Sequence, residues 1–248
     1  MNRNDLLSRM DTLLEPWRFS DYAPNGLQVE GRETVKRVVT GVTASQALID
    51  EAVRLDADMV LVHHGYFWKG EDARVNGLKR RRLKTLLDHD INLVAYHLPL
   101  DAHPEVGNNA TLAKRLGIEP EGRVGDMELL WHGSLARTLA GTEWADTIGA
   151  ALGRAPLLLG RPDKPVRRVA WCTGGAQSYF QKAIDLGVDA FLTGEVSEQN
   201  HHMALEYDVL FISAGHHATE RYGVQALGTW LADETGIDVQ FVDLFNPV

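Results

Sequence analysis

Short apolar runs along the chain end in polar segments that are rich in histidine. Three runs show this most clearly: Val60–Val62 precedes His63-His64-Gly65, Ile91–Tyr96 precedes His97, and Val209–Ala214 precedes Gly215-His216-His217. Short apolar runs of this kind are typical of strands buried in a parallel sheet. Binding sites form at strand ends in open α/β sheets, so we expect a site where these histidines emerge.

The same pattern occurs twice in the chain. A shift of 131 residues aligns residues 38–64 with residues 169–195 without a gap. Each copy predicts a strand, a helix with apolar residues at helical spacing, and a second strand. The predicted strands are Arg37–Val42 and Met59–Val62 in the first copy, and Arg168–Cys172 and Ala190–Thr193 in the second. A βαβ unit of this kind has parallel strands and, almost always, a right-handed crossover.

The repeat continues into the expected site with a different offset. His97-x-x-x-Asp101 corresponds to His216-x-x-x-Glu220, and each follows a strand and precedes a predicted helix, Asn109–Leu116 or Val224–Ala232. We therefore predict an α/β fold of two similar, interlinked lobes that arose by internal βαβ duplication. The expected lobes are residues 1–125 and 126–248, with the C-terminal segment packing back on the first lobe. Ligands from both lobes are expected to meet between them.

Composition limits the classes of protein to which this chain can belong. The 248 residues are 44% hydrophobic and 24% charged, which is typical of a globular protein and argues against disorder. A net charge of −9 argues against binding to nucleic acid, because such binding needs a basic surface. The basic run Lys79–Lys84 is interpreted as the solvated face of a helix. The single cysteine, Cys172, excludes an intrachain disulfide, and no apolar stretch approaches the roughly 20 residues of a membrane span, so we expect a cytoplasmic protein without membrane partners.

Imidazole and carboxylate side chains are the usual ligands of transition metals. Five residues are the candidate ligands: His63, His64, Asp101, His216 and Glu220. Residues four apart on a helix share a face, so helix formation after Gly215 would bring the last two ligands together. Five ligands exceed what one tetrahedral site with a bound water needs, and they suit two metals roughly 3.5–4 Å apart. We expect two divalent ions per subunit, either zinc, iron or manganese, with His97 and His103 as candidate catalytic proton carriers.

Several motifs together resemble the Nif-three-like family, whose bacterial members are called GTP cyclohydrolase 1 type 2 homologues. The motifs are Ser20–Val29, Val42–Ser45, Val62–Gly65, Thr193–Glu195 and Gly215–Glu220. The resemblance implies a toroidal homohexamer of two-lobed subunits, each with a dinuclear metal site held by the five candidate ligands. The chain departs from the family at Gln199, where many members have a histidine.

We interpret the chain as a metal-dependent hydrolase that acts on a small molecule, with a purine nucleotide as the candidate substrate. Two metals would lower the pKa of a bridging water and polarise the bond under attack. Two other classes use the same ligands: a metal-binding regulatory protein, and a ring-shaped scaffold without catalysis. The pair Gly174-Gly175 after a strand is a weak candidate for a phosphate loop, and a tight turn is the simpler interpretation.

Overall fold

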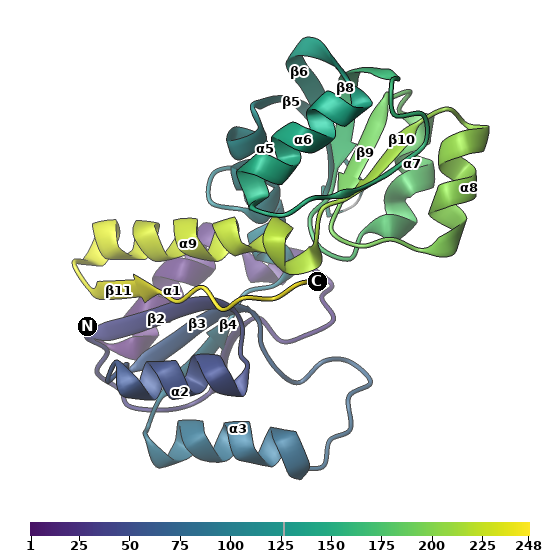
Figure 1. Cartoon of the computed structure of the whole chain (residues 1–248). Coiled ribbons are helices and arrows are strands. Elements are labelled where there is room, and N and C mark those ends of the chain that lie inside the picture. The colour runs from purple at the N-terminus through teal and green to yellow at the C-terminus, as the bar shows by residue number, and fades with distance from the viewer. Residues whose placement is uncertain (126) are drawn as a thin grey trace. The chain divides into compact units, whose positions relative to one another are not determined.

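The computed structural model describes residues 1–125 and 127–248. It shows a mixed α/β fold with two sheets, and the chain divides into two compact units (Figure 1). Unit 1 comprises Met1–Gly107 and Gly223–Phe245, and unit 2 comprises Asn108–Tyr222 and Asn246–Val248. The lobe boundary expected between residues 125 and 126 involves Asp126, which lies outside the described residues.

Unit 1 is built on a five-stranded sheet of order β1-β4-β3-β2-β11. Strands β4, β3, β2 and β11 are parallel, and β1 pairs with β4 in the antiparallel sense. The elements of unit 1 are α1 Arg3–Leu14, η1 Pro16–Arg18, β1 Gly26–Val29, β2 Arg37–Thr43, α2 Gln46–Arg54, β3 Met59–His64, α3 Gly77–Asp88, β4 Asn92–Ala95, α4 Leu98–Ala102 and β11 Asp238–Phe241.

Helices cover both faces of this sheet, because successive residues of its strands point to opposite sides. Val38 packs into one core with Leu6 of α1, and its neighbour Val39 packs into another core with Leu48 of α2. Helix α9, His216–Thr235, adds Leu227 and other apolar residues to the first core. Helix α3 packs beside α2, and its one buried residue, Leu86, belongs to the same core as Leu48. The sheet is therefore the middle layer of unit 1 (Figure 1).

Unit 2 has a six-stranded sheet of order β5-β6-β8-β9-β10-β7. Strands β8, β9 and β10 are parallel, and the remaining pairs are antiparallel. The elements of unit 2 are α5 Asn108–Leu116, β5 Ile118–Val124, β6 Leu130–Ala140, α6 Gly141–Leu152, β7 Leu157–Leu159, β8 Pro165–Trp171, η2 Gln177–Tyr179, α7 Phe180–Asp185, β9 Ala190–Thr193, α8 Glu198–Glu206 and β10 Leu210–Ser213. The unit boundary falls inside α9, after Tyr222.

The predicted βαβ pairs are present in both units, and their registers correspond. Val38 pairs with Met59 in unit 1, and Val169 pairs with Ala190 in unit 2, so both partners differ by the same 131 positions. The next strand pair also corresponds, since Val60 lies opposite Leu93 and its counterpart Phe191 lies opposite Phe211. Three parallel strands therefore have the same arrangement in each unit.

An aspartate before the second strand holds the start of the first strand in each unit. In unit 1, Asp58 Oδ2 accepts the backbone N–H groups of Lys36 and Arg37 at 2.7 and 2.9 Å. In unit 2, Asp189 Oδ2 accepts those of Arg167 and Arg168 at 2.9 and 2.8 Å. The two donors in unit 1 and the two in unit 2 are separated by the same number of positions as the strands. We conclude that this contact is a structural device of the shared βαβ unit.

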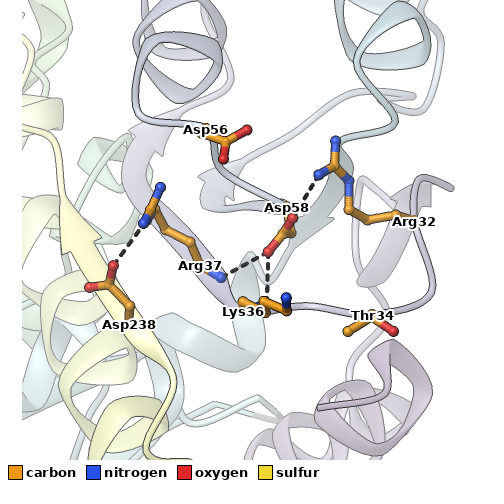
Figure 2. A pocket seen from close by; sticks show the side chains of 7 residues that line it. All are labelled: Arg32, Thr34, Lys36, Arg37, Asp56, Asp58 and Asp238. Atoms are coloured by element: carbon orange, nitrogen blue, oxygen red, sulfur yellow. Dashed lines mark hydrogen bonds and ion pairs between the residues drawn. The ribbon is translucent and has the colours of Figure 1, made fainter.

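A pocket of about 670 Å³ lies around Asp58, at the amino ends of β2 and β3 (Figure 2). Four of its charged groups form two ion pairs: Arg32 pairs with Asp58 at 2.9 Å, and Arg37 pairs with Asp238 at 3.0 Å. The full lining is Arg32, Thr34, Lys36, Arg37, Asp56, Asp58 and Asp238. The paired charges account for this pocket as part of the strand-start structure.

Among the residues that the structure describes, no helix is both long and apolar enough to span a membrane.

The aspartate contact generates a prediction about stability. We expect Asp58→Ala to lower the free energy of unfolding by about 2–3 kcal/mol, because two backbone N–H groups lose their acceptor. Asp189→Ala should have a similar effect in unit 2. Glu234→Ala, at an exposed position of α9, is the control and should change it by less than about 0.5 kcal/mol. Denaturant unfolding measures all three, and equal stability of Asp58→Ala and Glu234→Ala would contradict the structural role.

Candidate metal centre

His63 lies at the end of β3 and is completely buried. Its Nδ1 is 3.0 Å from the backbone carbonyl oxygen of Tyr96, which can only accept a hydrogen bond. Nδ1 therefore carries the proton of the neutral ring, and Nε2 has a lone pair. That Nε2 lies 3.4 Å from Oδ1 of Asp101, a buried residue of α4. The carbonyl thus selects the tautomer that presents a nitrogen lone pair to a carboxylate.

The spacing of these two atoms fits a shared cation. A neutral imidazole nitrogen and a carboxylate oxygen both carry lone pairs and repel each other unless a proton or a metal lies between them. Metal bonds of about 2.0–2.2 Å in tetrahedral geometry place two ligand atoms roughly 3.4 Å apart. The separation of His63 Nε2 and Asp101 Oδ1 matches this value. The donor set of unit 1 is therefore suited to a divalent transition metal.

Two further imidazoles lie beside His63. The ring of His64 is 4.5 Å from that of His63 and the ring of His97 is 5.1 Å from it, measured between centroids. Ligand atoms of these three residues all lie within 4.8 Å of one another, so the group could hold a metal ion. Although consecutive residues of a strand usually point to opposite faces, the two rings at the end of β3 approach each other closely.

Asp21 orients His97 through a buried carboxylate. Asp21 Oδ1 is 2.7 Å from His97 Nδ1, and Oδ2 accepts the backbone N–H of Leu98 at 3.0 Å. Burial alone raises the pKa of Asp21, but hydrogen bonding and the charge of His97 outweigh it and lower the pKa to about 2. Asn25 completes the arrangement, because its Oδ1 accepts the backbone N–H of His97 at 2.8 Å. The segment after η1 therefore directs Nε2 of His97 away from Asp21.

His103 caps the turn that follows α4. Its Nδ1 accepts the backbone N–H groups of Glu105 and Val106, each at 3.2 Å. In the neutral ring the proton therefore lies on Nε2. His103 thus has a structural contact that the sequence gives no sign of, and its part in proton transfer stays a prediction.

A second group of acidic and imidazole side chains lies in unit 2, at the start of α9. His216 Nε2 lies 3.0 Å from Glu220 Oε2, and His216 Nδ1 lies 2.6 Å from Glu195 Oε1. Helix α9 begins at His216, so His216 and Glu220 lie one turn apart on the same face of the helix. Burial by itself lowers the pKa of His216, but Glu220 and then Glu195 raise it to about 9. The two carboxylates therefore favour the protonated form of this ring.

Two glycines make room for this group. Gly174 has φ of +68°, and a Cβ there would collide with Oε1 of Glu220. Gly194 approaches the backbone of His216 so closely that a Cβ would collide with it. Position 174 therefore requires glycine, both because of its backbone conformation and because there is no space for a Cβ. The positive φ of Gly174 agrees with the interpretation of Gly174-Gly175 as a tight turn. This turn also borders the carboxylate of Glu220.

Sequence reasoning did not assign roles to Asp21 and Glu195. Asp21 lies in the family-like segment after residue 19, but 76 residues separate it from His97 and no spacing rule connects the two. A signal for Glu195 was present, because the 131-residue repeat aligns it with His64.

Known proteins resemble this chain along nearly its whole length. A relative from Pseudomonas aeruginosa named GTP cyclohydrolase 1 type 2 homolog is 58% identical over 245 residues, which is 98% of this chain and 97% of the relative. A solved structure titled protein ybgI, unknown function, is 57% identical, covers both chains completely and has a TM-score of 0.97. The structure of TTHA1606 from Thermus thermophilus is 35% identical, also covers both chains completely and has a TM-score of 0.90.

The family model described as Duf34/NIF3, NGG1p interacting factor 3, matches residues 1–247. The family resemblance found in the sequence motifs is confirmed by this match and by the full-length relatives, and the chain belongs to the DUF34/NIF3 family.

Proposed function

We propose that the protein is a metal-dependent hydrolase whose dinuclear centre is held by His63, His64, Asp101, His216 and Glu220. The observation that carries this proposal is the contact of His63 Nε2 with Asp101 Oδ1 at 3.4 Å, with the tautomer set by a carbonyl. The pair of His216 and Glu220 supports it with a second nitrogen and oxygen at 3.0 Å. Imidazole and carboxylate ligands suit zinc, iron and manganese.

The residues around the ligands have distinct roles in this proposal. When bound, two divalent metals supply Lewis acidity that activates water and polarises the substrate. Asp21 holds the proton on Nδ1 of His97, which leaves Nε2 to accept a proton from water or to return one to the leaving group. Glu195 orients His216 in the same way, because it contacts Nδ1 of that ring while Nε2 faces Glu220. His103 is the second candidate proton carrier.

A purine nucleotide is the substrate that we propose, with attack at C8 and ring opening as the reaction. The support is the name GTP cyclohydrolase 1 type 2 homolog, which full-length relatives at 57–58% identity carry. The polar and imidazole groups of both units suit hydrolysis in general, so the nucleotide rests on the relatives rather than on the site.

Two statements about the origin and assembly of the chain belong to the same proposal. The matching strand registers and the paired roles of Asp58 and Asp189 support an internal duplication. The toroidal homohexamer rests on the family resemblance, and sedimentation velocity of purified protein tests it through the mass of the particle.

The first prediction concerns metal content. Protein purified without chelator should contain close to two divalent metals per chain by elemental analysis. His63→Ala should lose at least one of them, because it removes a buried nitrogen ligand. His89→Ala is the control, since His89 is exposed and its Nδ1 bonds the carbonyl of Thr85. A reproducible content of one metal or fewer in fully supplemented wild type would exclude the dinuclear centre.

The second prediction concerns the orientation of His97. Asp21→Asn should lower kcat by about 10- to 100-fold, because partners that orient imidazoles at metal sites typically contribute this much. The amide can still accept at one oxygen, so the fold should persist, and circular dichroism checks this. Asp5→Asn, an exposed residue of α1, is the control. Wild-type turnover in Asp21→Asn would show that this contact has no part in catalysis.

The third prediction is the activity itself. Metal-loaded protein should hydrolyse GTP slowly, in a manner that depends on added divalent metal. The double variant His63→Ala, His64→Ala should have no activity, whereas His89→Ala should match wild type. The same rate in the double variant would identify a contaminant as the source. No turnover by fully metallated wild type would favour the metal-binding or scaffold class.

A further inference from the structure

Tyr22 presents an exposed aromatic ring beside the histidines of unit 1. The residue is 59% exposed, and its ring meets that of His97 edge-on, with 6.4 Å between centroids. Its backbone is held at both ends: the N–H donates to Asp21 Oδ1 at 2.6 Å, and the carbonyl accepts the N–H of Lys69 at 2.6 Å. Within the described part of the chain, no hydrogen bond involves its hydroxyl. A rigid backbone therefore holds a ring whose surface faces mostly water.

Trp68 lies against the same histidines from a second loop. Its ring is 4.9 Å from that of His97 at an interplanar angle of 83°, and 6.0 Å from that of His64. The indole N–H donates to the carbonyl of Gly65 at 3.2 Å, and the backbone N–H donates to Glu71 Oε2 at 3.1 Å. These bonds hold Trp68 in one place, so the indole is a fixed wall beside His64 and His97.

The loop that carries Trp68 contains a strained residue. Phe67 has φ of +64°, a value that bulky residues rarely adopt and that costs on the order of 1–3 kcal/mol. Tyr66 anchors the loop from the other side, because its buried hydroxyl donates to the carbonyl of Ala44 at 2.6 Å. Such strain persists only where surrounding contacts enforce it, and it concentrates at binding and catalytic sites.

We propose that Tyr22 is the stacking platform for the planar ring of the substrate, with Trp68 as the fixed wall of the same subsite. The inference rests on the proposed hydrolysis of a purine nucleotide and names the residues that would hold its base. An aromatic face stacks on any nucleobase, and a ring held by a rigid backbone loses little entropy on binding. Stacking on Tyr22 places the base next to His97, the residue proposed to move the proton.

Exposure alone would not distinguish Tyr22 from other surface aromatics. Trp17 is 68% exposed and Phe245 is 92% exposed, and single exposed aromatics are normal on protein surfaces. Among the ring contacts of the described residues, neither of these two touches a histidine of the candidate centre. Tyr22 differs because a fixed backbone, an exposed ring face and a histidine neighbour coincide at one position.

Calorimetric titration with guanosine tests this subsite without requiring turnover. Guanosine has the purine ring but no phosphate, and ribose 5-phosphate has the phosphate but no ring. Tyr22→Ala should weaken guanosine binding by roughly 5- to 100-fold, the range for loss of one base–aromatic stack. Tyr22→Phe should stay within about twofold of wild type, because it keeps the ring. Trp17→Ala is the matched control for removal of an exposed aromatic and should bind as wild type does.

The titration separates this inference from the proposed reaction. Ring-dependent guanosine binding without GTP hydrolysis would support the subsite and overturn the hydrolase proposal. Equal affinity of Tyr22→Ala and Tyr22→Phe for guanosine would overturn the subsite, as would failure of folded, metal-loaded wild type to bind guanosine. An equal loss of ribose 5-phosphate binding in Tyr22→Ala would also overturn it, because the effect would then not depend on the ring. Circular dichroism and metal content of each variant confirm that the fold and the centre are intact.

Discussion

Each parallel strand pair begins where two backbone N–H groups donate hydrogen bonds to one aspartate carboxylate. Asp58 and Asp189 precede β3 and β9 and hold the starts of β2 and β8. In a sheet, a slip of one residue would turn every side chain of the strand to the other face. The register set at the amino ends therefore decides which residues emerge at the carboxyl ends. In unit 1 these are His63 and His64.

Sequence patterns predicted the elements that depend on local periodicity. The apolar runs gave the parallel strands, and the 131-residue repeat gave βαβ pairs whose registers correspond. A spacing of four brings His216 and Glu220 onto one face if the chain is helical after Gly215, and the structure places their side chains 3.0 Å apart. The start of α9 was predicted too late, at Val224, because the polar residues at its first turn interrupt the apolar spacing.

Contacts between distant segments could not be predicted in this way. The carbonyl of Tyr96 sets the tautomer of His63, yet any residue at that position has a carbonyl. Asp21 reaches His97 only because the segment before β1 lies beside the end of β4, which is a property of the antiparallel β1–β4 pair. The short helix α4, which carries Asp101, has too few residues for a helical period to be visible. Composition and spacing therefore predict which chemical groups are present, and the fold determines how each is oriented.

The discontinuity of unit 1 has a consequence for how the chain folds as it is synthesised. Residues 1–107 leave the ribosome before unit 2 and α9, so until then their core lacks Val224, Leu227 and Leu231 of α9, and β2 lacks its partner β11. Nearly all of unit 2 emerges before those residues do. Since domains generally fold as units during synthesis, we expect unit 2 to complete its core first, while the earlier segment keeps an open sheet edge at β2. The segment of unit 1 that is synthesised before unit 2 is thus the last to complete its sheet and its core.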